Sequence, residues 1–350
     1  MINEIGSEFW KEDKKYINDN ERLFLSGRTA LDAIIKDAKK EHIIKSVLLP
    51  SYCCHTMIEP FMRNNIKVRF YDVYIDENGD ICADIPIPRK QEMFYKMNYF
   101  GAVNIKQVNI QVGLGLWDVS VEDTTHSCFC DRYKSEADYE FASYRKWFAL
   151  EGFCIAKKNK GFFLDELKLI VHTKYCKIRK EAFHNKYTYM NGGKDDKKKY
   201  LNQFDLAEKL LEEDYVGYCP DLNSIVEFFN EKDRFDKIKY IRRKNASILV
   251  QELKEIEMIQ PVISKINENI CPLCFPIILP KKMRDGLKKY LIEQDIYVPI
   301  HWPISKVHSG ITNRGREIYD RELSLICDHR YDTDDMKREA NIVRKFFNNV

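Results

Sequence analysis

The stretch SVLLPSYCCHTMIEPFMRNNIKVRFYDV, residues 46–73, decides the fold class. It begins with the short apolar run Ser46–Pro50, which is typical of a buried strand, and it ends with a second strand pattern over 68–73. Between the two, residues 57–62 have the spacing of a short helix. Strands that are joined through a helix pair in parallel, so the stretch predicts an α/β fold with a largely parallel sheet.

The same alternation continues on both sides of this stretch. On the N-terminal side, Ser26-Gly27 opens a predicted helix with Ser26 as its N-cap, because apolar residues recur there at helical spacing: Leu31, Ile34, Ile35 and Ala38. On the C-terminal side, further strands are predicted over 92–99 and 117–121. We therefore expect a large domain in which helices flank a mostly parallel mixed sheet.

The rest of the sequence predicts a loop and a second domain. Residues 185–200 contain Gly192-Gly193 and a lysine-rich run, which indicate an exposed loop. A smaller α+β pattern follows, with helices over 235–253, 283–292 and 334–347 and strands over 270–279 and 296–300. We accordingly divide the chain into a large domain, 1–235, with an N-terminal arm over about 1–22, and a small C-terminal domain, 236–350.

The composition excludes several classes of protein. Hydrophobic residues make up 44% of the 350 residues, which is enough for a deep core and excludes a disordered chain. The charges are balanced, 57 Lys and Arg against 54 Asp and Glu, and this gives no basis for a nucleic-acid-binding protein. No apolar run reaches the roughly 18 residues that a membrane span needs.

The cysteines favour a reducing compartment. Eleven are scattered along the chain, and the N-terminus lacks the apolar run of a signal peptide, so we expect a cytoplasmic protein without a disulfide framework. Two close pairs, Cys128 with Cys130 and Cys271 with Cys274, have no second pair at zinc-finger spacing. No metal site is predicted.

Two features lie at the ends of predicted elements. Ser26-Gly27-Arg28-Thr29 stands at a helix start, where free N–H groups and the helix dipole favour a phosphate, although a simple Ser-Gly cap has the same pattern. Asp123 ends a predicted buried strand, where open α/β sheets place their ligands, and His126 follows it. The alternative for this second feature is a capping Asp beside a surface His.

The third feature is Lys146, which stands among Trp147, Phe148 and Leu150 and beside Arg145. Apolar surroundings and a neighbouring cation favour a neutral, reactive amine. The alternative is that Lys146, like most lysines beside aromatic residues, packs its alkyl chain on them and extends a charged ammonium group into water. A phosphate seat, a strand-end carboxylate and a lysine 23 residues after it are together what pyridoxal 5′-phosphate (PLP) requires. The three features in this order therefore predict a PLP site.

With these motifs the chain resembles the DegT/StrS-type aminotransferases, PLP enzymes of fold type I that act mostly on nucleotide-linked keto sugars. The order and spacing of the matching stretches hold over nearly the whole length. The stretches are FLSGRTALDAII (24–35), VLLPSYCCHTMIEPF (47–61), VRFYDV (68–73), NYFG (98–101), VEDTTHS (121–127), FASYRKWFALEGF (141–153), RRKN (242–245), IYVPIHWPI (296–304) and DHRYDTDDM (328–336).

The resemblance implies a role for each matching residue. Lys146 would bind the cofactor covalently, Asp123 would pair with the ring nitrogen, and His126 would face the ring hydroxyl. The cofactor phosphate would be held by Gly27, Arg28, Thr29 and Ser143. In relatives an aromatic residue of the loop after residue 50 stacks on the ring, and here Tyr52, Cys54 and His55 are the candidates.

The substrate residues are less well defined. Tyr52, His301 and Arg330 are candidates, but His301 could belong to a packed strand end, and Arg330 could pair with Asp328 or Asp332.

The resemblance also implies an amino donor such as glutamate, a keto-sugar acceptor and a homodimer, with a role in amino-sugar or surface-polysaccharide synthesis. Three alternatives remain: a small carbonyl substrate, a non-catalytic binding protein on the same fold, and a nucleic-acid module that uses the lysines of 194–199. The shortened glycine motif Leu150-Glu151-Gly152-Phe153 keeps the second of these open.

Overall fold

The computed structural model describes residues 17–102, 105–131, 135–164, 168–193, 196–213, 216–231 and 234–348, so most of the predicted N-terminal arm lies outside it. Its largest element is an eight-stranded sheet in the order β1-β8-β7-β6-β5-β2-β3-β4. In chain order the strands are β1 (Glu21–Phe24), β2 (Ser46–Pro50), β3 (Lys67–Ile75), β4 (Ile81–Asp84), β5 (Glu92–Met97), β6 (Val119–Asp123), β7 (Tyr139–Ser143) and β8 (Cys154–Lys158).

The centre of this sheet is parallel and its margins are antiparallel. Strands β7, β6, β5, β2 and β3 pair in parallel, whereas β8 and β4 run the other way. Strand β1 pairs antiparallel with β8 and therefore has the direction of the central strands again. The mostly parallel mixed sheet predicted from the sequence is thus confirmed. From β2 the chain order runs outward in both directions, to β3 on one side and to β5 on the other, and open α/β sheets bind ligands at such a switch point.

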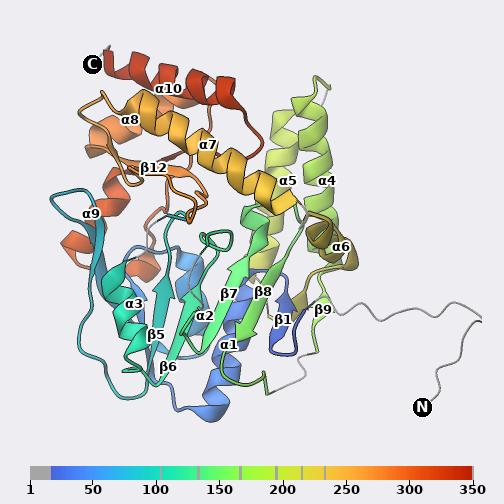
Figure 1. Cartoon of the computed structure of the whole chain (residues 1–350). Coiled ribbons are helices and arrows are strands. Elements are labelled where there is room, and N and C mark those ends of the chain that lie inside the picture. The colour runs from blue at the N-terminus through green and yellow to red at the C-terminus, as the bar shows by residue number, and fades with distance from the viewer. Residues whose placement is uncertain are drawn as a thin grey trace, which may run out of the picture.

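Helices cover the sheet, as Figure 1 shows. Helix α1 (Gly27–Glu41) packs on β7 and β8, α2 (His55–Arg63) packs on α1 and β3, and α3 (Lys106–Gly113) packs on β4 and β5. The amphipathic spacing predicted for α1 is borne out, because Leu31, Ile34, Ile35 and Ala38 are all buried. Apolar side chains on these helices and on both faces of the central strands form the main core.

A second hydrophobic core lies in the C-terminal part of the chain. Helices α7 (Phe235–Leu253), α8 (Lys281–Glu293) and α10 (Thr333–Asn348) surround a small sheet of β11 (Gln260–Pro261), β12 (Phe275–Ile278) and β13 (Glu322–Leu325), above the main sheet in Figure 1. The three predicted helices are confirmed. The domain boundary near 235 stays a prediction.

The predicted strand over 296–300 is wrong. These residues are extended but join no sheet. The carbonyl of Pro299 accepts a backbone hydrogen bond from Ser324 N of β13 (3.1 Å). Proline has no N–H to donate to a ladder, which explains why the segment does not pair as a strand.

The predicted loop over 185–200 is also largely wrong. Helix α4 (Thr173–Met190) and helix α5 (Lys197–Glu213) pack as an antiparallel hairpin and take up most of that range. Gly192 ends the first helix with a φ of 78°, a conformation that glycine adopts without strain. Tyr200 of the lysine-rich run is buried in the hairpin, and its aromatic contacts offset the polar pattern that favoured a loop.

Several short elements complete the described structure. They are β9 (Ile170–Val171), β10 (Tyr218–Cys219), α6 (Leu222–Glu231), α9 (Asn313–Arg321) and two 3-10 helices, η1 (Tyr144–Lys146) and η3 (Lys306–His308). All eleven cysteines are free in the structure. None of the helices in the described ranges is long and apolar enough to cross a membrane.

Candidate functional site

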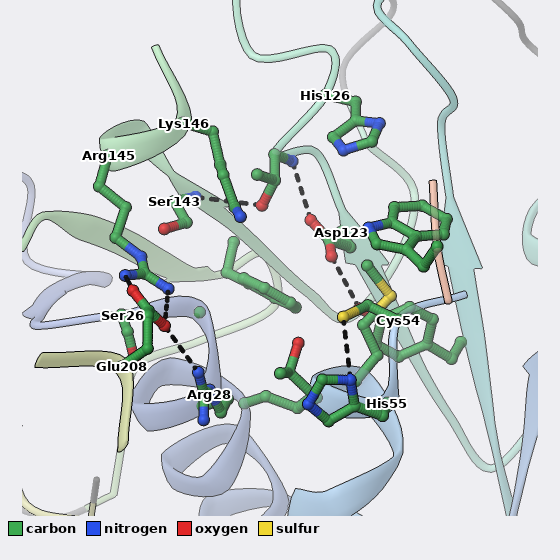
Figure 2. A pocket seen from close by; sticks show the side chains of 18 of the residues that line it. Ser26, Arg28, Cys54, His55, Asp123, His126, Ser143, Arg145, Lys146 and Glu208 are labelled. Atoms are coloured by element: carbon green, nitrogen blue, oxygen red, sulfur yellow. Dashed lines mark hydrogen bonds and ion pairs between the residues drawn. The ribbon is translucent and has the colours of Figure 1, made fainter. Parts of the chain in front are cut away.

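A cavity of about 450 Å³ opens at the carboxyl ends of the central parallel strands (Figure 2). It lies where β2, β6 and β7 end and where α1 begins, next to the switch point of the sheet. The structure brings six of the ten predicted site residues to its walls: Gly27, Arg28, Asp123, His126, Ser143 and Lys146. Segments that are far apart in the sequence thus meet at one place.

The first turn of α1 forms one wall. Ser26 caps the helix, and its Oγ accepts a hydrogen bond from Thr29 N (3.3 Å). Thr29 itself is buried and bonds to Ser26 Oγ through its hydroxyl (3.1 Å), so its side chain serves the cap and does not line the cavity. Gly27 lets the turn approach β7, because a Cβ there would lie 3.3 Å from the Phe141 ring.

Asp123 lies at the end of β6 with both carboxylate oxygens hydrogen-bonded. Tyr95 Oη donates to Oδ2 and Thr125 N donates to Oδ1, each at 2.8 Å. Burial raises the pKa of Asp123 above its usual value, although these two donors oppose the shift. A cation placed beside Asp123 would therefore be bound strongly, because it would replace the lost hydration of the carboxylate.

His126 is held as a neutral imidazole. Its Nδ1 accepts a hydrogen bond from Phe100 N (3.3 Å), which puts the ring proton on Nε2. Burial lowers the pKa of His126 well below its usual value, and the neighbouring His301 and Lys146 lower it further. Trp302, which also lines the cavity, packs against the ring at 5.5 Å between centroids.

Lys146 projects from η1 into the cavity (Figure 2). Its side chain is exposed to that space, but the surrounding walls still desolvate the amine and, with Arg145, lower its pKa. The next residue, Trp147, is buried and donates from Nε1 to Thr125 O (2.7 Å), which fixes the backbone that carries the lysine. Within the described chain no residue forms a hydrogen bond or ion pair with Lys146 Nζ.

Ser143 is buried at the end of β7, beside the cavity. Its backbone N–H donates to Thr125 Oγ1 (3.1 Å), yet its Oγ has no hydrogen-bond partner among the described residues. A buried hydroxyl that lacks a partner costs free energy, so a hydroxyl left open at a cavity wall indicates a polar ligand.

The structure adds charged residues that the sequence did not assign. Glu208 of α5 accepts from Arg145 Nη1 at 2.6 Å and pairs with Arg28 Nη2 at 3.2 Å. Burial opposes ionisation of Glu208, but Arg145 and the other nearby cations outweigh it and lower the pKa of Glu208 to about 2. No local sequence motif identifies Glu208, because its partner Arg28 lies 180 residues away in the sequence.

Cys54 and His55, two of the candidates for stacking on a cofactor ring, form a pair at the cavity wall. Cys54 Sγ lies 3.7 Å from His55 Nδ1, and both side chains line the cavity (Figure 2). Burial alone would raise the pKa of Cys54, but its hydrogen bond to His55 turns the shift downward, while the same bond raises the pKa of His55. Tyr52, the third candidate for stacking on a cofactor ring, is fully buried and does not reach the cavity.

The three predicted substrate residues lie outside the cavity walls. Tyr52 packs among Tyr99, Trp302 and Tyr319 instead. His301 turns away, and its Nδ1 lies 2.9 Å from Ser324 Oγ.

Arg330 forms a bidentate ion pair with Asp328 at 2.9 and 2.6 Å, which is the alternative that the sequence had left open. The guanidinium is thus already paired with a carboxylate of its own loop.

Comparison with known proteins gives a match by structure alone. No protein-family model and no curated protein matches the sequence. Among solved structures, a DegT DnrJ EryC1 StrS aminotransferase from Brucella abortus has a TM-score of 0.63 and 14% identity, over 93% of this chain and 85% of the other. The chain has the fold of this aminotransferase.

Two further solved structures carry ligands. DesI, in the presence of its TDP-sugar product, has a TM-score of 0.64 and 13% identity, over 93% of this chain and 80% of the other. NtdA from Bacillus subtilis, with bound cofactor PMP, has a TM-score of 0.64 and 12% identity, over 93% of this chain and 73% of the other. The large PLP-type α/β fold with a smaller C-terminal part, expected from the sequence, is confirmed by these similarities.

Proposed function

We propose that this protein is a PLP-dependent aminotransferase that moves an amino group from an amino acid, such as glutamate, to a keto sugar. One observation carries the proposal: Lys146, Asp123 and the first turn of α1 line a single cavity. The TDP-sugar product of DesI and the PMP of NtdA support a nucleotide-linked sugar and this cofactor. A homodimer, which the family resemblance implies, and a cytoplasmic location, which the cysteines favour, belong to the same proposal.

The residues of the cavity fit a phosphorylated pyridine. The α1 N-terminus, with Gly27 and Arg28, favours an anion, and the open Ser143 Oγ supplies a further donor. The buried Asp123 suits a protonated ring nitrogen, and a volume of about 450 Å³ is ordinary for a cofactor site. PLP supplies a ring that withdraws electrons from the carbon next to its bound nitrogen.

Asp123 would hold the ring nitrogen in its protonated form. A cationic partner favours the ionised carboxylate, so ligand binding would reverse the upward pKa shift that burial causes. Tyr95 and Thr125 orient the carboxylate through their two hydrogen bonds. His126, with its proton on Nε2, is a neutral donor for the ring hydroxyl.

Lys146 would serve first as the covalent attachment point and then as the general base. Its lowered pKa increases the fraction of free amine near neutral pH. With the amino donor in the cavity, Lys146 Nζ would act as the general base that takes the proton from the donor Cα. The Trp147 anchor keeps that nitrogen over the cavity.

Lys146→Ala tests the covalent role directly. Borohydride reduction should fix PLP on the wild-type protein and on a Lys157→Ala control, whose lysine pairs with Glu140 outside the cavity, but not on Lys146→Ala. Mass spectrometry of the reduced peptides reads out the label. Persistent labelling of the Lys146→Ala protein would refute the assignment.

Asp123→Asn should leave PLP bound and slow proton transfer by about 100-fold or more, because a neutral amide cannot stabilise the protonated ring nitrogen. Stopped-flow absorbance after addition of glutamate measures the rate. An unchanged rate would mean that another group serves the ring nitrogen.

The acceptor is tested by adding keto-sugar nucleotides and small carbonyl compounds to the amine form of the cofactor on the enzyme. Return of the yellow colour with a nucleotide sugar supports the proposal. Return only with small carbonyl compounds would favour the alternative substrate class, and colour that glutamate never changes would favour a binding protein.

A further inference from the structure

We propose that Arg145, together with Arg28, binds the cofactor phosphate, and that Glu208 occupies the two guanidinium groups until the phosphate displaces it. This inference rests on the proposed function, and it concerns two residues that neither the motifs nor the resemblance assigned. It begins from the fact that Arg28 and Arg145, from different elements, reach the same carboxylate (Figure 2).

The surroundings of Arg145 are those of a phosphate site. Ser143, two residues earlier on the same segment, has a buried Oγ without a partner among the described residues, and it lines the cavity with Ser26 and Gly27 at the α1 N-terminus. Arg145 Nε likewise has no hydrogen-bond partner within the described ranges. A guanidinium offers paired donors that match phosphate oxygens, and a helix N-terminus adds backbone donors.

Glu208 lies between these two arginines and borders the same cavity. It bonds to Arg145 at 2.6 Å and to Arg28 at 3.2 Å, and Arg179 approaches it at 3.5 Å. Its side chain is 37% exposed, so it can leave its position without crossing a packed core. A carboxylate and a phosphate dianion repel each other, and therefore binding of the phosphate at the arginines requires Glu208 to move away.

Two consequences follow for the affinity of the site. Loss of the Arg145 guanidinium should weaken the binding only of ligands that carry a phosphate. Loss of the Glu208 charge should strengthen the binding of these ligands, because the phosphate no longer competes with a resident anion. The binding of inorganic phosphate should become stronger after the second change as well, since it needs the arginines but not Lys146.

The test compares PLP, pyridoxal and inorganic phosphate on four proteins: wild type, Arg145→Gln, Glu208→Gln and Glu212→Gln. Glu212 is the matched control, because it is on α5 and lines the cavity but lies near His55 instead of the arginines. Absorbance titration gives the affinity for PLP and pyridoxal, and calorimetry gives the affinity for inorganic phosphate.

We expect Arg145→Gln to weaken the affinity for PLP by about 10-fold or more, because a charge-assisted hydrogen bond is lost. The affinity for pyridoxal should change by less than about twofold. Glu208→Gln should tighten PLP and inorganic phosphate severalfold, and Glu212→Gln should change neither. Circular dichroism checks the fold of each variant. Arg145→Lys, which keeps the charge, should restore part of the affinity if Arg145→Gln folds poorly.

Other results would overturn the inference. Equal loss of PLP and pyridoxal in Arg145→Gln would show that the arginine does not contact the phosphate, and weaker PLP binding in Glu208→Gln would give the glutamate a merely structural role. A wild-type protein that forms no covalent adduct at Lys146 with either PLP or pyridoxal would instead refute the proposed function. The calorimetry with inorganic phosphate still decides the role of the arginines in that case.

Discussion

Cys54 has a thiol that its contact with His55 should make reactive. Its pKa is lowered by His55 in spite of burial, so part of the thiol is already thiolate at pH values where an ordinary cysteine is protonated. Iodoacetamide should therefore alkylate Cys54 faster than Cys82, a partly buried cysteine whose pKa is raised by burial and by Asp76. Peptide mapping after a short exposure at pH 7 measures the two rates.

His55→Ala provides the control for this prediction. Without the imidazole, the lowering of the Cys54 pKa is lost, and the pH at which alkylation becomes half-maximal should rise. A pH profile that stays unchanged in His55→Ala would show that the pair does not set the reactivity. PLP should protect Cys54 in the wild-type protein, because both occupy the same cavity.

The residues of the site divide into those that a local pattern reveals and those that only the fold assembles. Gly27, Asp123 and Lys146 each belong to a short motif at an element end, and the sequence was sufficient to propose them. Glu208 belongs to no motif, because its meaning depends on arginines from two other elements. For Arg330 the sequence left two interpretations open, and the fold pairs its guanidinium with Asp328 of the same loop.

At the scale of elements, α10 carries a buried acid whose charge is unfavourable. Glu339 accepts one hydrogen bond from Ile326 N (3.1 Å), but its Oε2 has no partner among the described residues. Burial, with a contribution from nearby Asp328, raises its pKa to about 8. The folded protein therefore binds this proton more tightly than the unfolded chain does, and stability is lost as the pH rises from about 4.5 through 8.

Glu339→Gln should remove this pH dependence, because glutamine stays neutral. Between pH 5 and pH 9 the wild-type protein should lose stability relative to Glu339→Gln, by on the order of a few kcal/mol in the free energy of unfolding. Urea denaturation at both pH values measures it. The exposed Glu255→Gln serves as the control substitution, and a constant difference for Glu339→Gln would mean that Glu339 is ionised in the folded protein.

The elements that the sequence predicted well are those with a clear apolar pattern. Helix α1 has a 3.6-residue apolar spacing and β2 is a continuous apolar run, and the predicted start of α1 and the predicted bounds of β2 agree with the structure. The α4–α5 hairpin was missed because lysines and glycines outweighed the few buried aromatic residues that hold it, such as Tyr200. The segment 296–300 was misassigned because an extended, half-buried chain has the same alternation as a strand even where no neighbour pairs with it.

At the scale of the whole molecule, one tyrosine of the C-terminal part fixes the loop that forms a cavity wall. Tyr319 of α9 is buried, and its hydroxyl accepts from Cys53 N (2.9 Å) and lies 2.7 Å from Ser51 O. His308 Nε2 lies 3.0 Å from Cys53 O and closes the same contact. The loop after β2 and the C-terminal part are thus joined by hydrogen bonds directly before Cys54 and His55.

Tyr319→Phe should weaken both stability and cofactor binding. Removing the hydroxyl leaves buried backbone groups of the loop unpaired, at a cost of roughly 1–3 kcal/mol, which corresponds to a fall in Tm of a few degrees. Because the loop carries the cavity wall, the dissociation constant of PLP should rise severalfold as well. Differential scanning fluorimetry and absorbance titration measure the two effects, with the exposed Tyr240→Phe as the control. If Tyr319→Phe lowers the Tm but leaves PLP affinity unchanged, the hydroxyl stabilises the molecule without positioning the site.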